Sequence, residues 1–513
     1  MSTDESVMVA HAGISFQPTR SDAAFDAAVL DVGSNSVRLV IYRVEGRAIW
    51  TLFNEKVLAG LGRDVAKGDG LSLAGVAAAM AALRRFRAVL DAVKPADIHA
   101  VATAAVRDAR DGPNFVQRVE AQTGFRLKIL TGEEEARYAA LGVAAGIPAA
   151  DGVTGDLGGS SLELTRLKHG RPGRGVTLPL GPFALGLGKP FDAGAVHREA
   201  ARTLAKIDGF SARTFYAVGG AWRSLALLHM RMADYPLEIL QQYEISAGEA
   251  LDACRFAARQ SRSSLERIEG LSKKRVEALP FAAVVMEALI ERLELERVCI
   301  SAYGLREGLV FDAMAHELQA RDPLIEGCAA LGARQEIAED LGQALNVWLQ
   351  PALSTLPPLF APGRDAVLTA AACRLADLGS RLHPDHRADL VFEQVLRAPV
   401  ASMDHPERAF LALALFARHT ASSNIPEPSI LGRLLSAERQ QRARALGAAI
   451  RLGCDLSGRS AALLAKSSLA FEPNTVRVRA APDAADLLLG EQTGRRAATL
   501  AALLEREVRL SAE

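Results

Sequence analysis

The sequence lacks features on which several protein classes depend. Its five cysteines are far apart and odd in number, which indicates neither a disulfide framework nor a zinc site and suits a reducing compartment. No apolar run approaches the roughly 18 residues that a membrane helix needs. The first 25 residues have no basic segment followed by an apolar one, so we expect no signal peptide. With 60 basic and 60 acidic residues, net charge gives no sign of nucleic-acid or membrane binding.

Lysine is also scarce. Ten of the 60 basic residues are lysine and the other 50 are arginine. A GC-rich genome explains this bias, and so does a need for guanidinium groups, which grip oxyanions in bidentate fashion. Composition does not separate the two explanations.

The chain has enough length and apolar content for several packed domains. Its 513 residues correspond to about three domain units, and its 49% apolar and 23% charged residues are typical of globular proteins. We expect a flexible N-terminal tail, two α/β domains, a helical domain and a small C-terminal domain. The corresponding residues are 1–25, 26–147, 148–320, 321–469 and 470–513.

The two α/β segments open with the same pattern. Short apolar runs separated by glycine-containing turns predict a β-meander at the start of the first, and the pattern begins again in the second. Strands are expected at residues 27–31, 37–44, 47–53, 98–102, 125–130, 153–157, 162–168, 215–218 and 297–301. This repetition predicts a duplicated architecture with a cleft between the halves. Helical patterns dominate after residue 321, and alternation over 471–480 predicts a small strand-containing end piece.

A polar turn follows the first strand of each half. In the first turn, Asp31-Val32-Gly33-Ser34-Asn35-Ser36, glycine and short polar residues allow backbone N–H groups to converge on an anion, while the aspartate can hold Mg²⁺. A simple hairpin turn with a polar cap explains this motif equally well. The second, Asp156-Leu157-Gly158-Gly159-Ser160-Ser161-Leu162-Glu163, repeats it 125 positions later. A hairpin there can bring Asp156 and Glu163 to one cation.

Together these motifs resemble the exopolyphosphatase / guanosine pentaphosphate phosphohydrolase family, a branch of the actin-like, sugar-kinase and heat-shock ATPase superfamily. Three further segments are similar to family motifs: residues 103–107, 132–137 and 301–308. The resemblance implies an α/β fold of two actin-like (ribonuclease H-like) domains with a central cleft. An all-α HD-like helical module and a small C-terminal piece would follow.

The resemblance also implies roles for individual residues. Glu135 would be the general base that deprotonates the attacking water, with Glu134 as the alternative because a run of three glutamates leaves the register open. Favourable interaction with the helix macrodipole would by itself explain glutamates here. Asp31, Asp156 and Glu163 would hold Mg²⁺ or another divalent cation. The implied phosphate-binding residues are Gly33, Ser34, Asn35, Ser36, Arg107, Gly158, Gly159, Ser160, Ser161, Gly219 and Gly220.

Two departures from the family pattern stand out. Trp222 follows the third glycine turn, where the superfamily binds adenosine, so it either blocks a nucleotide pocket or stacks on a base. In the helical module, Ala376 precedes Asp377 where the resemblance would place a histidine of a His-Asp metal pair. We therefore expect no working metal centre in that module, despite His383, His386, His405 and His419 nearby, and a structural and substrate-guiding role instead.

Residues 433–479 carry nine basic and three acidic residues, a local charge of +6. Arg433, Arg444 and Arg451 could share one helix face, as could Arg439 and Arg442. Either this is a solvated surface, or it is a track that guides a polyanion to the cleft. Aromatic residues, which RNA-binding stripes interleave, are missing from 433–470.

The resemblance favours an exopolyphosphatase that releases the terminal orthophosphate of inorganic polyphosphate. The alternatives are a guanosine pentaphosphate 5′-phosphohydrolase and a non-catalytic sensor of polyphosphate or of guanosine penta- or tetraphosphate. We expect no nucleic-acid or membrane partner, a homodimer and a cytoplasmic location.

Overall fold

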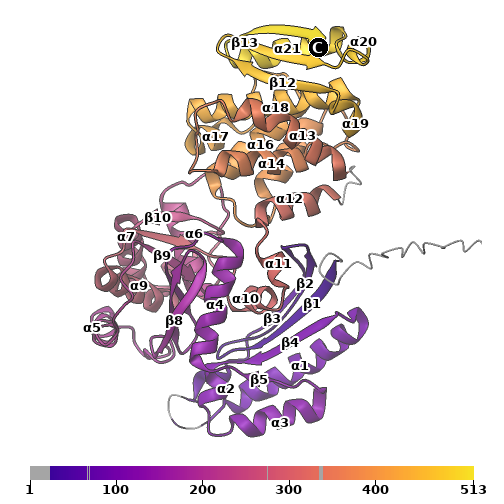
Figure 1. Cartoon of the computed structure of the whole chain (residues 1–513). Coiled ribbons are helices and arrows are strands. Elements are labelled where there is room, and N and C mark those ends of the chain that lie inside the picture. Colours follow the sequence, from indigo (N-terminus) through magenta and orange to yellow (C-terminus); the bar gives the residue numbers. More distant parts are fainter. Residues whose placement is uncertain (1–23, 66–67, 69, 274, 334–338, 513) are drawn as a thin grey trace, which may run out of the picture.

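The computed structural model describes residues 24–512 apart from 66–67, 69, 274 and 334–338. The predicted N-terminal tail, residues 1–25, therefore lies almost entirely outside the described residues. Figure 1 shows an elongated chain in which two sheet-containing domains lie together at one end. A helical domain follows, and a small sheet forms the other end.

The first domain is built on a five-stranded sheet in the order β3-β2-β1-β4-β5, in which β1, β2 and β3 form the predicted antiparallel meander. The predicted strand at 125–130 is shorter than expected, since only Lys128–Ile129 pair with β4. The elements are β1 (Phe25–Val32), β2 (Val37–Glu45), β3 (Ala48–Val57), η1 (Leu61–Arg63), α1 (Leu73–Val93), β4 (Asp97–Ala102), α2 (Ala104–Asp108), α3 (Gly112–Thr123), β5 (Lys128–Ile129) and α4 (Gly132–Gly146).

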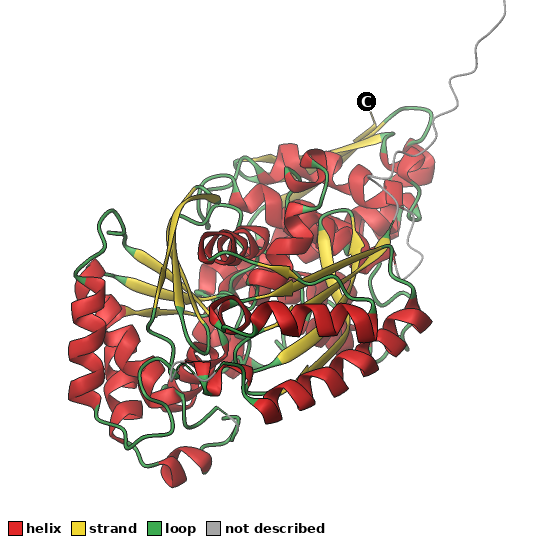
Figure 2. Ribbon diagram, turned by 90° about the horizontal axis from the view of Figure 1, so that it is seen from below, coloured by secondary structure: helices red, strands yellow, loops and turns green. Residues whose placement is uncertain are grey.

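The second domain repeats this arrangement around a six-stranded sheet in the order β10-β11-β9-β6-β7-β8. Antiparallel β6, β7 and β8 correspond to β1, β2 and β3, and β9 pairs with β6 in parallel as β4 does with β1. Helices flank the sheets (Figure 2). The elements are β6 (Gly152–Leu157), β7 (Leu162–Lys168), β8 (Arg171–Leu178), α5 (Ala193–Leu204), β9 (Thr214–Val218), α6 (Gly220–Met232), β10 (Glu244–Ser246), α7 (Ala247–Arg259), α8 (Arg262–Glu266), α9 (Leu279–Leu293), β11 (Arg297–Ile300), α10 (Leu305–Asp312) and α11 (His316–Gln319).

Helices α4 and α10 lie between the two sheets and join the domains. One side of α4 packs on the second sheet through Ala140 and Val143. Apolar residues of α10 and α11, including Leu309 and Phe311, return to the first sheet although they follow the second one in sequence. The small residues of α4 allow this close approach, because a side chain on Gly142 would overlap the carbonyl oxygen of Gly304.

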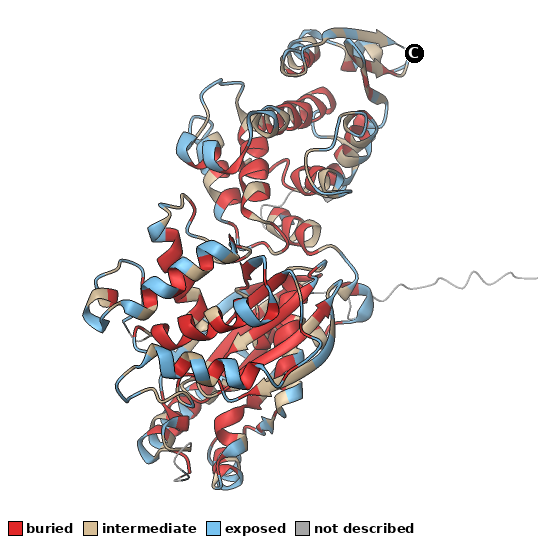
Figure 3. Cartoon of the chain, turned by 90° about the vertical axis from the view of Figure 1, so that its left-hand side faces the viewer, coloured by how far each residue is buried: buried red, intermediate tan, exposed pale blue. Residues whose placement is uncertain are grey.

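The helical domain and the C-terminal piece share one continuous apolar core, and buried residues gather on the inward sides of their helices (Figure 3). Residues 471–480 are part of a hairpin, β12–β13, to which β14 adds a parallel strand. The elements are α12 (Pro323–Ala333), α13 (Glu339–Leu353), α14 (Arg364–Arg374), α15 (Arg387–Arg397), α16 (His405–His419), α17 (Pro428–Leu434), α18 (Ala437–Ser457), α19 (Ala461–Leu464), β12 (Ser467–Glu472), β13 (Thr475–Ala480), α20 (Ala485–Leu488), α21 (Glu491–Leu503) and β14 (Glu507–Ala512).

The sequence predicts neither a disulfide framework nor a membrane-spanning helix. All five cysteines are buried and free. Of the helices in the described part of the chain, none combines the length and the apolar character that crossing a bilayer requires.

The contact between α4 and α10 yields a stability prediction. A methyl group at Gly308 would overlap the carbonyl oxygen of Tyr138, so Gly308→Ala should destabilise the protein by about 1–3 kcal/mol, the usual cost of overpacking. Gly248→Ala is the matched control, because Gly248 is an exposed helical glycine whose added methyl group meets nothing within 4 Å. Thermal unfolding of both variants measures the difference. A Gly308→Ala variant as stable as Gly248→Ala would show that the contact tolerates expansion.

Candidate functional site

The two domains enclose a cavity of about 450 Å³. Its walls come from the two polar turns, from the beginnings of α6 and α10, and from the first turn of α4. The cavity therefore lies where the duplicated sequence predicts a cleft.

The two turns have the same internal structure. The N–H of Gly33 donates to the carbonyl of Ser36, and the N–H of Gly158 donates to that of Ser161, both at 2.9 Å. These two amides are thus used inside the turns rather than directed at a ligand. The turns also approach each other across the domains, because a Cβ on Gly159 would lie 3.2 Å from the Cβ of Ser34. Only a glycine fits comfortably at this contact.

The structure brings most of the predicted phosphate-binding residues together. Those that line the cavity are Ser34, Asn35, Ser36, Gly158, Gly159, Ser161, Gly219 and Gly220. Gly33, Ser160 and Arg107 are outside its described lining. Ser160 instead faces the first domain, with its Oγ 3.4 Å from where a Cβ of Gly62 would be.

The structure separates the two candidate bases. Glu134 completes a capping box at the start of α4, accepting from the N–H of Thr131 at 2.9 Å, and it pairs with Lys128 at 2.6 Å. Both interactions hold its carboxylate outside the cavity. Glu135, the next residue, is 8% exposed and lines the cavity.

Arg107 contacts this second glutamate. Its Nη1 donates to Oε2 of Glu135 at 2.9 Å and to the carbonyl of Leu130 at 3.1 Å. Burial raises the pKa of Glu135 to about 7, and the Arg107 guanidinium opposes that rise. A carboxylate with a pKa near neutrality is suited to proton transfer. Arg107 therefore positions and tunes Glu135 in this structure, whereas direct phosphate binding by Arg107 stays a prediction.

Asp156 and Glu163 are directly opposite each other on β6 and β7, as the hairpin prediction requires. Burial raises the pKa of Asp156 to about 6 and raises that of Glu163 well above its usual value, and neighbouring carboxylates add to both shifts. Within the described structure, the buried Oε1 of Glu163 has no hydrogen-bond partner. A bound cation would satisfy this oxygen and relieve the repulsion between the two carboxylates.

The chemistry of these donors fits a hard divalent cation such as Mg²⁺, which prefers carboxylate oxygens and water. The third predicted ligand, Asp31, also lines the cavity, but its Oδ2 accepts from Nη1 of Arg306 at 2.7 Å. No group of three or more His, Cys, Asp or Glu side chains among the described residues is arranged as a metal cluster. The metal assignment therefore stays a prediction, and it is best supported for Asp156 and Glu163.

A second group of residues gives the cavity a cationic wall. On the first sheet, Arg38 of β2 is directly opposite Asp31 of β1 on one side and Lys56 of β3 on the other. Burial lowers the pKa of Lys56 to about 8, and the nearby charges of Arg275, Arg38 and Arg306 lower it further. Like charges directly opposite each other on a sheet are destabilising. A site that keeps them is suited to an anion of high charge.

The cationic wall is completed by arginines from the second domain and from α10, and sequence reasoning missed it as a group. Its members are Arg38, Lys56, Arg223, Arg275 and Arg306. One signal was available in the sequence: a hairpin around the first turn pairs Asp31 with Arg38 and directs both to the same face. The others depend on tertiary contacts.

The structure corrects the interpretation of Trp222. Its side chain is fully buried in the core of the second domain, in an edge-to-face contact with Phe215 at 5.4 Å. Its Nε1 donates to the carbonyl of Ala282 at 2.9 Å. Trp222 therefore neither stacks on a base in the cavity nor obstructs the cavity, because its apolar ring packs in the protein interior.

The structure also changes the interpretation of the basic segment. Arg433 lies on α17, a different helix from Arg444 and Arg451 on α18, so the predicted shared face of the three is wrong. Arg439 donates to the carbonyl of Leu359 at 2.8 Å and Arg442 to that of Pro357 at 3.2 Å. These bonds anchor a loop, which favours a structural role over a polyanion track.

In the helical module, Asp377 lies beside arginines. Its Oδ1 is 3.3 Å from Nε of Arg459 and 3.7 Å from Nη2 of Arg418. His419 contacts the carbonyl of Leu378, and His405 contacts Tyr235. Two guanidinium groups thus occupy the surroundings of Asp377 where a metal pair would need a histidine.

Comparison with known proteins places these features in a family. The two repeated α/β domains enclose a cavity with both acidic and cationic walls, and its guanidinium groups suit phosphate oxygens. Residues 40–317 match the Ppx/GppA phosphatase family, and residues 362–510 match the C-terminal part of exopolyphosphatases. The first match covers more than half of the chain, which therefore belongs to the Ppx/GppA phosphatase family.

Individual relatives are similar at a lower level. Exopolyphosphatase 1 of Mycobacterium tuberculosis is 26% identical over 304 residues, covering 56% of this chain and 88% of that protein. Retrograde regulation protein 2 of Saccharomyces cerevisiae is 24% identical over 389 residues, covering 67% of this chain and 63% of that protein.

Solved structures share the fold. The PPX-GPPA enzyme of Aquifex aeolicus matches with a TM-score of 0.50 at 24% identity, covering 56% of this chain and 99% of that one. An exopolyphosphatase from Cytophaga hutchinsonii matches with a TM-score of 0.52 at 20% identity, covering 56% and 97%. The predicted mixed α/β fold of actin-like domains is confirmed. The HD-like character of the helical module, the homodimer and the cytoplasmic location stay predictions.

The raised pKa of Asp156 predicts a pH-dependent cost in stability. A carboxyl group whose pKa is higher in the folded state than in the unfolded one stabilises the fold below its unfolded pKa, near 3.8, and this contribution is lost as pH rises through about 6. In chelator, Asp156→Asn should therefore raise the thermal unfolding midpoint by a few degrees at pH 8 and by less at pH 5. The control is Asp208→Asn, whose side chain is 96% exposed and should show no such difference. Equal shifts at both pH values would contradict the assigned pKa.

Proposed function

We propose that this chain is an exopolyphosphatase that hydrolyses the terminal phosphate of inorganic polyphosphate and releases orthophosphate. The observation that carries the proposal is the cationic wall. Arg38, Lys56 and Arg275 line the cavity without an ion pair to any carboxylate in the described structure. A chain of phosphates, with about one negative charge per unit, would supply the missing counter-charge.

The proposed reaction uses water and the base at the start of α4. Glu135 would accept a proton from the water as its oxygen attacks the terminal phosphorus. The P–O bond to the rest of the chain would break, and its bridging oxygen would leave with the shortened polyphosphate as an anion. Cations of the wall, among them Arg306 and Lys56, would hold the non-bridging oxygens and stabilise this charge. Arg107 would orient the Glu135 carboxylate.

A divalent cation fits beside these groups. Asp156 and Glu163 would hold it, with Asp31 assisting, and when bound it would neutralise charge on the phosphoryl oxygens. Ser34 and Ser161, one from each turn, line the same cavity, and their side chains would contact the terminal phosphate.

The scarcity of aromatic residues in the cavity lining supports polyphosphate over guanosine pentaphosphate. Of its described lining residues, Phe183 is the one aromatic, and its ring would be 3.3 Å from a Cβ on Gly159. With Trp222 buried elsewhere, few flat surfaces are available for a guanine base. The relative named exopolyphosphatase 1 supports the same choice.

Orthophosphate release from long-chain polyphosphate and from guanosine pentaphosphate, at matched concentrations with Mg²⁺, tests the proposal. We expect faster release from polyphosphate, loss of activity in EDTA and recovery with added Mg²⁺. Faster release from guanosine pentaphosphate would assign the chain to the second activity. No release from either compound, with binding retained, would favour the sensor.

The base assignment predicts a contrast between adjacent residues. Glu135→Gln removes the proton acceptor and should lower turnover by roughly 10²–10⁴-fold while leaving polyphosphate affinity nearly unchanged. Glu134→Gln is the matched control, since its carboxylate caps the same helix outside the cavity, and its turnover should fall much less. Steady-state phosphate release and equilibrium binding separate the two effects. The reverse order of the two variants would show that Glu134 is the base.

A further inference from the structure

A second cavity, of about 240 Å³, lies in the C-terminal half of the molecule. It is bounded by the end of α16 and the loop after it, by α18 and by α21. It shares no described lining residue with the cavity between the α/β domains. The proposed reaction gives it no role, although two of its lining arginines, Arg444 and Arg451, belong to the basic segment 433–479.

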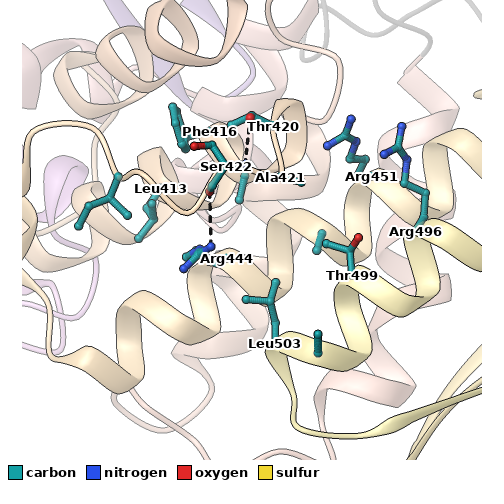
Figure 4. Close-up of a pocket in the computed structure, with 14 residues that line it drawn as sticks. Leu413, Phe416, Thr420, Ala421, Ser422, Arg444, Arg451, Arg496, Thr499 and Leu503 are labelled. Carbon is teal, nitrogen blue, oxygen red and sulfur yellow. Dashed lines mark hydrogen bonds between the residues drawn. The ribbon is translucent and has the colours of Figure 1, made fainter.

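The walls of this cavity differ in character. The apolar part includes Leu413 and Phe416 of α16 and Leu503 of α21. The other part carries three arginines, Arg444 and Arg451 from α18 and Arg496 from α21. Figure 4 shows the side chains of Arg451 and Arg496 next to each other, with their guanidinium groups at the same end of the site.

The arginines exceed the available negative charge. Arg496 and Arg451 share one carboxylate, Asp455, whose Oδ2 lies 2.6 Å from Nε of Arg496 and 4.0 Å from Nε of Arg451. Arg444 reaches the carbonyl of Ser422 at 3.4 Å, and no ion pair from Arg444 to a carboxylate is found in the described part of the chain. Burial lowers the pKa of Arg451, and the charge of Arg496 lowers it further. Two of the three positive charges therefore have no counter-ion within the site.

We propose that this cavity binds a small amphipathic anion, with an oxyanion group on the arginines and a ring or short acyl chain against the apolar wall. A guanidinium pair suits the oxygens of a carboxylate, sulfonate or phosphate ester. Inorganic phosphate or polyphosphate would leave the apolar wall without a partner. The volume, slightly below the range of usual ligand sites, limits the occupant to a small molecule.

The site touches the helix that joins the two halves of the molecule. Helix α16 lines the cavity at its end and begins at His405, whose Nδ1 contacts the hydroxyl of Tyr235 in the second domain at 2.8 Å. Just before α16, the N–H of Ser402 donates to the carbonyl of Gly146, the last residue of α4. A ligand in this cavity would thus contact the same helix that meets the catalytic half.

The probe for this site is 8-anilinonaphthalene-1-sulfonate, an aromatic sulfonate whose fluorescence rises in apolar surroundings, titrated into the full chain. We expect one saturable site. Arg451→Gln and Arg496→Gln should each weaken binding by about tenfold, the loss of one charged hydrogen bond. Ala448→Leu should abolish it by filling the cavity, which Ala448 lines. Arg495→Gln is the matched control, because Arg495 is the exposed neighbour of Arg496 and lies outside the described lining.

Competition tests the chemistry of the ligand. Benzenesulfonate should displace the probe, whereas benzyl alcohol, inorganic sulfate and tripolyphosphate at the same concentration should not. Displacement by sulfate or tripolyphosphate equal to that by benzenesulfonate would show that the cavity binds anions without regard to an apolar group. Equal displacement by benzyl alcohol would show that it binds apolar molecules without regard to charge. Either result would overturn the proposal. Unchanged probe binding in Ala448→Leu would also overturn it. Unchanged circular dichroism and phosphate release in each variant control for misfolding.

Discussion

Two cross-strand pairs of like charge face the same cavity, and the rest of the site depends on them. Asp156 and Glu163 are opposite each other in the second domain, and Arg38 and Lys56 are opposite each other in the first. Like charges directly opposite each other on a sheet are destabilising. Burial, together with nearby groups of the same sign, shifts the pKa of all four side chains toward the neutral form. A divalent cation would relieve the first pair and a chain of phosphates the second, so the proposed metal–polyphosphate complex would match both at once.

The fold fixes the positions of these charged residues relative to one another. Equivalent hairpins in the two halves present equivalent turns, which meet at Gly159 and Ser34. Helices α4 and α10 fix the relative position of the sheets, and both also carry site residues, Glu135 and Arg306. Their glycine contacts leave little room for adjustment. The same packing that holds the domains together would therefore set the distance between the proposed base and a bound phosphate.

Local sequence patterns predicted the hairpins, their turns and the carboxylates, because these features depend on neighbouring residues only. The choice between Glu134 and Glu135 needed the capping box, which shows which side chain is already used. The return of α10 to the first sheet, the burial of Trp222 and the loop contacts of Arg439 all depend on partners far away in the sequence. The cationic wall was missed for the same reason: Arg38 and Lys56 become a pair only once the strand register is known.

The central claim is that a cation and a phosphate chain bind this cavity together. Calorimetric titration of tripolyphosphate into the Glu135→Gln variant, with and without a fixed free Mg²⁺ concentration, measures this coupling directly. We expect Mg²⁺ to strengthen binding by about tenfold or more, a coupling of the usual size between linked ligands. The effect should disappear when Glu163→Gln is added to the variant. Equal affinities with and without Mg²⁺ would contradict the account.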